Sequence, residues 1–142
     1  GAGGAARAIA FGLKEKGCDI TIFNRTTERA EKLSQDVKCE FKSFEEIHKL
    51  DSDILINTTS IGMFPDVDQT PVSKNILKEG MIVFDAVYNP IETRLLRDAK
   101  EQGCHTVNGL SMFINQAAEQ FRLWTGIDAP IELMTKVVKE ML

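Results

Sequence analysis

The first six residues, GAGGAA, predict a tight turn directly before a helix. They fit the pattern G-x-G-x-x-G/A, with Gly1, Gly3 and Ala6 at the three small positions. In such a turn the first glycine permits the bend, the second lets a phosphate approach the backbone, and the third small residue lets the helix pack on a strand. The positive end of the helix favours an anion there. The residues predicted to line a dinucleotide site are Gly1, Ala2, Gly3, Gly4 and Ala5. Packing alone is the alternative reason for a glycine-rich helix start.

Beyond the turn, helical and strand-like patterns alternate along the chain. Helices are expected over residues 3–16, 26–37, 43–50, 91–102, 110–125 and 129–141. Strands are expected over residues 19–24, 39–42, 53–59, 81–87 and 104–108, and the third and fourth of these are apolar enough to be buried. Residues 60–71 have the composition of a loop. This alternation predicts an α/β fold of the Rossmann type, a doubly wound parallel sheet with helices on both faces.

The glycine motif requires a strand immediately before Gly1, and in the strand order 3-2-1-4-5-6 that strand is the central one. We therefore expect residues 1–142 to form one dinucleotide-binding domain, with helices over 110–142 at its end, whose first strand lies outside the given sequence. The chain is accordingly expected to be a piece of a larger protein.

Composition argues against several classes of function. The net charge of -4 offers no basic surface for nucleic acid, and no apolar run has the length of a membrane span. Cys18, Cys39 and Cys104 show no metal-binding or redox spacing, and we expect reduced, mostly buried thiols in a cytoplasmic protein. His48 and His105 lie far apart, so no metal site is expected.

The end of the second expected strand, FNRTTER, bears on the choice of dinucleotide. Sites for NAD place an acidic residue there to hold the ribose 2′-OH, but this chain has Asn24 followed by Arg25. An arginine suits a 2′-phosphate, which it grips through two parallel charge-assisted bonds. Thr26 can cap the next helix, and Arg29 adds charge one turn further on. One such bond contributes about 1.5–3 kcal/mol, so NADP is predicted. The alternative is that both arginines are solvated and pair with acidic residues of the same helix.

Five segments occur in a distinctive order: GAGGAARA, NRT, NTTSIGMFP, DAVYNPIET, and NGLSMFINQAA followed by WTG. Together they resemble the cofactor-binding half of the shikimate dehydrogenase family over essentially the whole chain. The first two segments are shared with other NADP enzymes, including glutamyl-tRNA reductase, whereas the last three are much more specific. The resemblance implies an NADP-dependent oxidoreductase that reversibly reduces 3-dehydroshikimate to shikimate. Two alternatives stay open: a quinate/shikimate dehydrogenase, and a non-catalytic NADP-binding regulatory module.

Two strand ends supply further candidate residues. Thr58, Thr59 and Ser60 follow the third expected strand and can offer hydroxyls to the cofactor at the carboxyl edge of the sheet, or can simply cap the loop. The resemblance places Val87 near the nicotinamide and Tyr88 facing the substrate. For Tyr88 the alternative is a core aromatic whose hydroxyl reaches water.

The helix expected over 110–125 has two distinct faces. Its apolar stripe, the expected core face, consists of Leu110, Ile114, Ala117 and Phe121. Met112 and Gln116 lie nearly opposite this stripe. The resemblance implies that Gly109 and Met112 border the nicotinamide and that Gln116 bonds a substrate hydroxyl. An exposed methionine and a solvated glutamine are the alternative.

The resemblance also implies what these residues lack. The catalytic lysine and aspartate of the family, and most of its substrate contacts, belong to a preceding domain, so no catalytic residue is assigned in this chain. Asp85 and Lys74 are not candidates for those roles. The partners expected are shikimate or 3-dehydroshikimate and a second copy in a homodimer, and the isolated chain is expected to be inactive.

Overall fold

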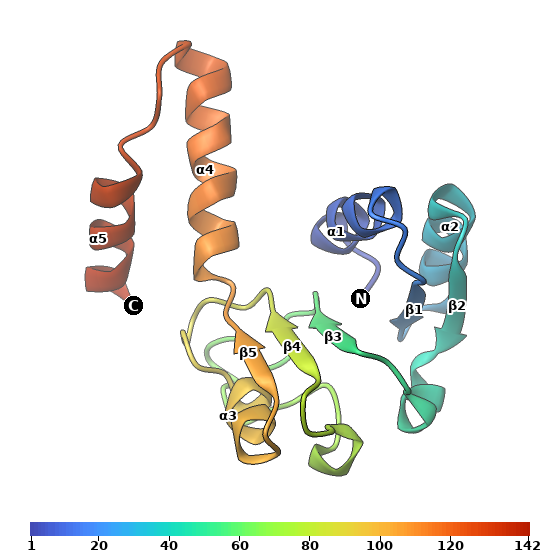
Figure 1. Cartoon of the computed structure of the whole chain (residues 1–142). Helices are drawn as coiled ribbons and strands as arrows, with labels where there is room; N and C mark the ends of the chain where they lie inside the picture. The colour runs from blue at the N-terminus through green and yellow to red at the C-terminus, as the bar shows by residue number, and fades with distance from the viewer.

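The computed structural model describes all residues 1–142 and has an α/β arrangement (Figure 1). The elements in chain order are α1 (Gly4–Glu15), β1 (Thr21–Asn24), α2 (Thr27–Val37), β2 (Glu40–Ser43), the 3-10 helix η1 (Phe44–Lys49), β3 (Ile54–Asn57), the 3-10 helix η2 (Lys74–Ile76), β4 (Ile82–Asp85), α3 (Arg94–Glu101), β5 (His105–Val107), α4 (Leu110–Thr125) and α5 (Ile131–Met141). All the expected helices and strands are therefore present, with boundaries moved by up to three residues. The helix expected over 43–50 is a 3-10 helix, started as expected by Ser43, whose Oγ accepts from Glu45 N.

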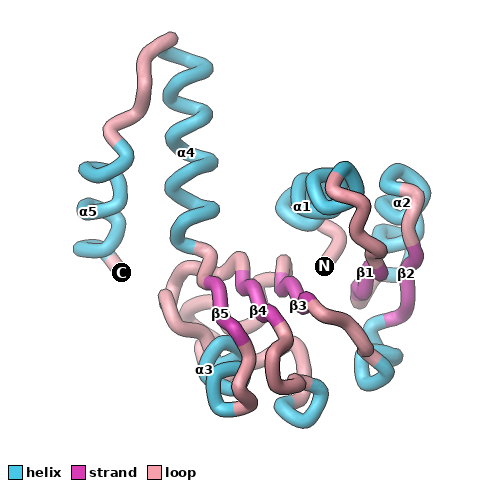
Figure 2. The backbone as a smooth tube through the Cα atoms, viewed as in Figure 1, coloured by secondary structure: helices cyan, strands magenta, loops and turns pink.

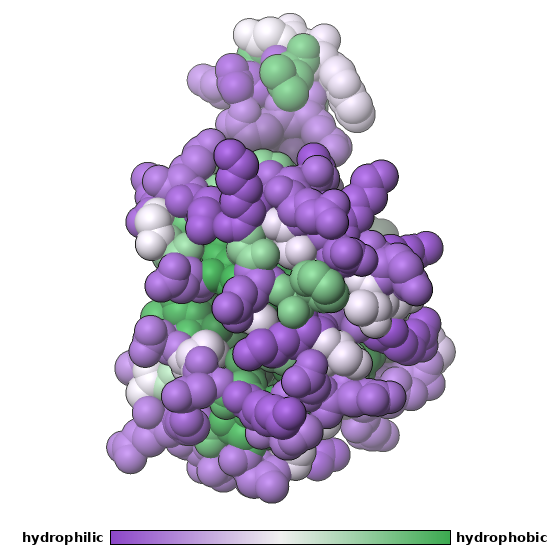
Figure 3. Space-filling view, turned by 90° about the vertical axis from the view of Figure 1, so that its right-hand side faces the viewer, coloured by the Kyte–Doolittle hydropathy of each residue, from purple (hydrophilic) through white to green (hydrophobic).

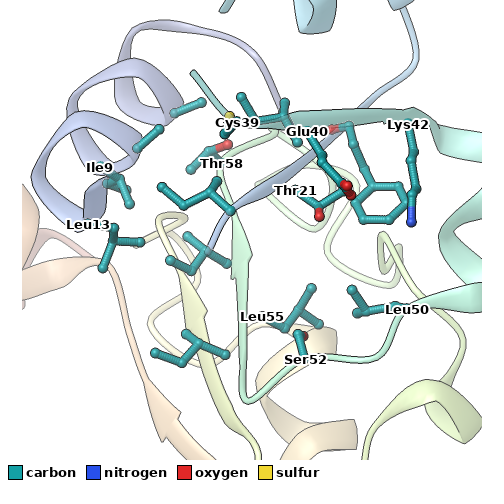
Figure 4. A pocket seen from close by; sticks show the side chains of 18 of the residues that line it. Ile9, Leu13, Thr21, Cys39, Glu40, Lys42, Leu50, Ser52, Leu55 and Thr58 are labelled. Atoms are coloured by element: carbon teal, nitrogen blue, oxygen red, sulfur yellow. Dashed lines mark hydrogen bonds between the residues drawn. The ribbon is translucent and has the colours of Figure 1, made fainter. Parts of the chain in front are cut away.

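The five strands are all parallel, as predicted, but they form two sheets (Figure 2). β1 pairs with β2, and β3, β4 and β5 form a three-stranded sheet in that order. A cavity of about 1000 Å³ lies between β1 and β3. Its lining includes Ile9 and Leu13 of α1, Thr21 of β1 and Leu55 of β3 (Figure 4).

Two separate clusters form the core. In the first, Leu55 and Val83 of the three-stranded sheet pack with Leu95, Leu96 and other apolar residues. In the second, the small residue Ala6 of the glycine motif packs with Ile22, Ala30, Leu33 and neighbouring side chains. The packing role predicted for Ala6 is thus observed.

The strands β3 and β4 are less buried than their apolar sequences predict. Leu55 and Val83 are buried, but Ile54 and Ile82 are 41% and 39% exposed. Successive side chains of a strand point to opposite faces, and the first core cluster covers only one face of this sheet. The expected burial holds for that face alone.

The helices α4 and α5 extend away from the sheets and lie side by side (Figure 1). Only Leu110, Ile114 and Ala118 of α4 are buried, whereas Ala117 and Phe121, expected on the core face, are half-buried. α5 has no buried residue. Large apolar side chains are exposed on and between these helices, including Leu123, Trp124, Ile127, Leu133 and Met141.

The face shown in Figure 3 is mainly hydrophilic, with patches of apolar residues among the polar ones. The cysteines Cys18, Cys39 and Cys104 are free and half-buried, so the expectation of mostly buried thiols is wrong; each lies shortly before a strand, where it is only partly covered. None of the helices combines the length and the hydropathy that crossing a membrane requires.

Candidate functional site

The carboxyl ends of the parallel strands carry the candidate residues. β1 ends at Asn24, β3 at Asn57 and β4 at Asp85, and the segments singled out by the sequence follow directly after them. A backbone bond from Ala86 N to Asn57 O, 2.9 Å long, continues the pairing of β3 and β4 beyond the strands. Parallel strands present their carboxyl ends at one edge of a sheet, where ligands bind in open α/β folds.

The glycine turn lies between the ends of β1 and β3. The amino group of Gly1 donates to Phe23 O at 2.7 Å, and a Cβ on Gly1 would lie 2.5 Å from Thr58 Oγ1. By contrast, a Cβ on Gly3 or Gly4 would meet no protein atom within 4 Å. Contacts within the chain therefore explain why position 1 is glycine, but they do not explain the glycines at positions 3 and 4. The absence of a side chain at these two positions leaves open space over the backbone.

The start of α1 has donors to offer in that open space. Gly3 occupies the N-cap position, no side chain caps the helix, and no acidic residue lies in its first turn. The first backbone N–H groups of such a helix have no partner within it. An open turn with free N–H groups fits a phosphate group, so the residues present fit the pyrophosphate of a dinucleotide.

The segment after β1 presents two free cations. Arg25 and Arg29 are exposed, and neither forms an ion pair, so the alternative in which they pair with acidic neighbours is not observed. Asn24 donates from Nδ2 to Thr26 O at 2.8 Å, which fixes the turn between β1 and α2. Thr26 is the N-cap residue of α2, but its side chain makes no capping bond, contrary to the expectation for it. Its hydroxyl stays available to a ligand.

A buried carboxylate joins the ends of β3 and β4. Asp85 is 0% exposed; its Oδ1 accepts from Asn57 Nδ2 at 2.9 Å and from Val87 N at 3.0 Å, and its Oδ2 accepts from Thr93 Oγ1 at 2.6 Å. Burial raises the pKa of the Asp85 carboxyl, although the three hydrogen bonds oppose the rise. Sequence reasoning assigned no role to Asn57 or Thr93. The available signal for Asn57 was its place as a polar residue at the end of an apolar strand, the place that Asp85 has in β4.

The three hydroxyl residues after β3 differ in their bonding. Thr59 turns its hydroxyl inward, because Oγ1 donates to Asn57 Oδ1 at 2.7 Å and accepts from Ile61 N at 3.2 Å. Thr58 is half-buried and Ser60 is exposed, and neither hydroxyl has a partner in the protein. Thr58 lies at the rim of the cavity between the two sheets (Figure 4). Of the three hydroxyls, those of Thr58 and Ser60 are free to bond a ligand.

The beginning of α4 is held against the end of β4. A Cβ on Gly109 would lie 2.3 Å from Ala86 O, so only glycine fits there. One turn later, Phe113 stacks on Tyr88 with ring centroids 4.2 Å apart and planes inclined by 21°. Sequence reasoning missed Phe113, because nothing in its pattern distinguishes it from a core aromatic. The stack fixes the ring of Tyr88 against the helix that carries Met112 and Gln116, which are half-buried and exposed respectively.

Comparisons with known proteins agree with this geometry. Residues 1–99 match the family of shikimate/quinate 5-dehydrogenases, and residues 109–139 match the C-terminal domain of shikimate 5′-dehydrogenase. A shikimate dehydrogenase (NADP⁺) of Methanosarcina mazei is 48% identical over 100% of this chain and 54% of that protein. The chain thus spans about half the length of the curated relatives that it matches.

Solved structures of two relatives show the same fold. A Thermus thermophilus shikimate 5-dehydrogenase in complex with NADP(H) and shikimate has a TM-score of 0.87 and 35% identity, over 100% of this chain and 53% of that one. A quinate dehydrogenase of Corynebacterium glutamicum in complex with NAD has a TM-score of 0.90 and 31% identity, over 99% of this chain and 53% of that one. The matched family model, the parallel α/β fold and the residues gathered at the sheet edge agree: the chain belongs to the shikimate/quinate 5-dehydrogenase family.

Proposed function

We propose that residues 1–142 are the NADP-binding part of a shikimate dehydrogenase, which catalyses reversible hydride transfer between NADPH and 3-dehydroshikimate to give shikimate. The single observation that carries the choice of cofactor is the pair of free arginines, Arg25 and Arg29, beside an open glycine turn. Relatives named shikimate dehydrogenase (NADP⁺) support the same choice. When bound, NADPH supplies the hydride.

The chain's own residues have distinct roles in this proposal. The backbone of Gly1 to Ala5 receives the pyrophosphate, and Arg25 and Arg29 pair with the 2′-phosphate. Asn24 shapes the turn that carries Arg25. The free hydroxyls of Thr26, Thr58 and Ser60 supply further polar contacts, and Thr59 holds the loop from within.

The residues near β4 and α4 serve the reacting end. Val87, Gly109 and Met112 border the nicotinamide, while Tyr88 and Gln116 face the substrate. The stack on Phe113 supports this assignment, because it prevents the Tyr88 ring from rotating away. The catalytic lysine and aspartate are assigned to a domain outside residues 1–142, as are most substrate contacts. A homodimer and a cytoplasmic location stay sequence-based predictions.

The test of cofactor choice is Arg25→Ala in the complete enzyme. Loss of one charge-assisted pair should raise KM for NADPH about tenfold or more and leave KM for NADH within about twofold. The control is Arg97→Ala, which removes an exposed arginine of α3. Equal effects of Arg25→Ala on the two cofactors would remove the 2′-phosphate role.

A second candidate substrate is quinate, because the quinate dehydrogenase of Corynebacterium glutamicum matches with a TM-score of 0.90. Measuring kcat/KM for shikimate and for quinate with the same enzyme decides between them. The proposal requires the higher value with shikimate.

A further inference from the structure

Asp85 is an unusual residue for the interior of this fold. Its side chain has no exposure to solvent, and no lysine, arginine or histidine pairs with it. A buried charge without a cation costs free energy, so packing alone gives no reason for a carboxylate at this position. Each of its three partners, Asn57 Nδ2, Val87 N and Thr93 Oγ1, donates to it, which is the arrangement that suits an ionised acceptor.

The carboxylate determines the orientation of two further groups. Because Asn57 turns its Nδ2 toward Asp85, its Oδ1 must face the opposite way, and it accepts there from Thr59 N at 3.0 Å and from Thr59 Oγ1 at 2.7 Å. The Thr59 hydroxyl donates its single hydrogen bond to Asn57 Oδ1, so toward Ile61 N it acts as the acceptor. Three consecutive hydrogen bonds therefore run from the Asp85 carboxylate through Asn57 and Thr59 into the loop 58–61.

The same carboxylate also restrains the segment after β4 and the start of α3. Val87 N is bonded to Oδ1, and Thr93, whose hydroxyl donates to Oδ2, accepts from Leu96 N as the cap of α3. The loop 58–61 and the segment 86–88 carry the polar and nicotinamide-facing contacts proposed above. We call Asn57, Thr59, Asp85 and Thr93 the Asp85 network.

We infer that Asp85 is a positioning residue for NADP: its carboxylate holds the loop 58–61 and the segment 86–88 in their binding arrangement without touching the cofactor. This inference rests on the proposed NADP-dependent function. It assigns the inward-turned hydroxyl of Thr59 to the support of this arrangement.

The primary test is Asp85→Asn in the complete enzyme. The amide keeps the shape of the side chain, weakens the bonds that were charge-assisted, and presents N–H groups toward the Thr93 hydroxyl. KM for NADP⁺ should rise about tenfold. The control is Asp98→Asn, which removes another buried carboxylate, paired with Arg94 on α3, and should lower the melting temperature with KM unchanged. A purely structural role for Asp85 predicts the same pattern as Asp98→Asn, and that result would overturn the inference.

A double-mutant cycle with Thr59→Val adds a second criterion. If Asp85 acts through Thr59, the double variant should raise KM for NADP⁺ little more than the more severe single variant. Multiplicative effects would contradict the network. If Asp85→Asn fails to fold, the variants Thr59→Val and Thr59→Ser provide the test. Thr59→Val, which lacks the hydroxyl, should raise KM for NADP⁺, whereas Thr59→Ser, which keeps it, should not. Equal KM values in the two variants would overturn the inference.

Two measurements on the wild-type enzyme distinguish a failure of the Asp85 inference from a failure of the proposed function. Calorimetric binding of NADP⁺ and oxidation of shikimate are first measured with the wild-type enzyme. If the wild-type enzyme neither binds NADP⁺ nor oxidises shikimate, the proposed function is refuted. If the wild type does both and the Asp85→Asn variant binds NADP⁺ with unchanged affinity, only the role of Asp85 is refuted.

Discussion

At the scale of single residues, the buried Asp85 carboxyl links stability to pH. Burial raises the pKa of this group above its usual 3.8 in the folded protein, so the folded state binds more protons than the unfolded state. The contribution of Asp85 to stability is then full below pH 3.8 and is lost as pH rises through the raised pKa.

This linkage predicts how Asp85→Asn changes the pH dependence. From pH 3.8 upward, the wild type should lose unfolding free energy relative to the variant, by about 1.4 kcal/mol for each pKa unit of the rise. Urea unfolding of the complete protein and of its Asp85→Asn variant between pH 4 and pH 7 measures the difference. Lysine partners lower the pKa values of three other carboxyls, those of Asp51, Glu92 and Glu101. These groups add unfolding free energy as pH rises, but they add it equally to the wild type and to the variant. A difference that stays constant with pH would contradict the expected linkage.

Some residues of the candidate site could be predicted from local sequence patterns and others could not. Gly1, Gly3 and Arg25 could be placed because their spacing from one turn and one strand end is local. The two side-chain partners of Asp85 lie 28 and 8 residues away in the chain, and the stack of Tyr88 on Phe113 joins a strand end to a helix. Such pairings depend on how the elements pack, which no local pattern encodes.

At the scale of elements, the contact between β4 and α4 depends on Gly109. The backbone carbonyls of Asp85 and Ala86 would lie 2.9 Å and 2.3 Å from an added Cβ, and backbone cannot move aside as a flexible side chain can. Any side chain at position 109 must therefore displace the start of α4, together with Phe113.

We accordingly expect Gly109→Ala to separate Tyr88 from Phe113 and to lower kcat/KM for shikimate about tenfold or more in the complete enzyme. Gly12→Ala is the matched control, because a Cβ there meets no atom within 4 Å and alanine favours the helix α1. Steady-state kinetics of both variants provide the measurement. Unaltered kinetics in Gly109→Ala would show that α4 can shift without affecting the site.

The order and type of the elements could be predicted from the sequence, whereas the burial of their side chains could not. Period and turn residues predicted α1 to α5 and β1 to β5 because both are local properties. The exposure of Ile54 and Ile82, and the absence of buried residues in α5, depend on which neighbours cover them. Apolar composition alone indicated burial that these elements do not have.

At the scale of the whole molecule, the cavity between β1 and β3 separates the two core clusters. The sequence predicts a central strand at this place, and a strand of five or six residues would bury roughly 300 Å² of apolar surface, worth several kcal/mol at about 25 cal/mol per Å². A domain's whole stability is about 5–15 kcal/mol.

Residues 1–142 expressed alone should therefore be marginally stable, bind NADPH weakly and not oxidise shikimate. Thermal unfolding followed by circular dichroism, titration with NADPH and an activity assay test these three expectations, with the complete enzyme as reference. A sharp cooperative melt with micromolar NADPH binding would show that no additional strand is needed, and turnover of shikimate would place catalysis within this chain.

The division into two sheets also leaves two strand edges unpaired on either side of the cavity. β1 and β3 each have one edge that pairs with no strand of the chain, and the unpaired N–H and C=O groups of such an edge are a template for a strand from another molecule. A strand seated in the cavity between β1 and β3 would pair with both edges at once and so remove both templates.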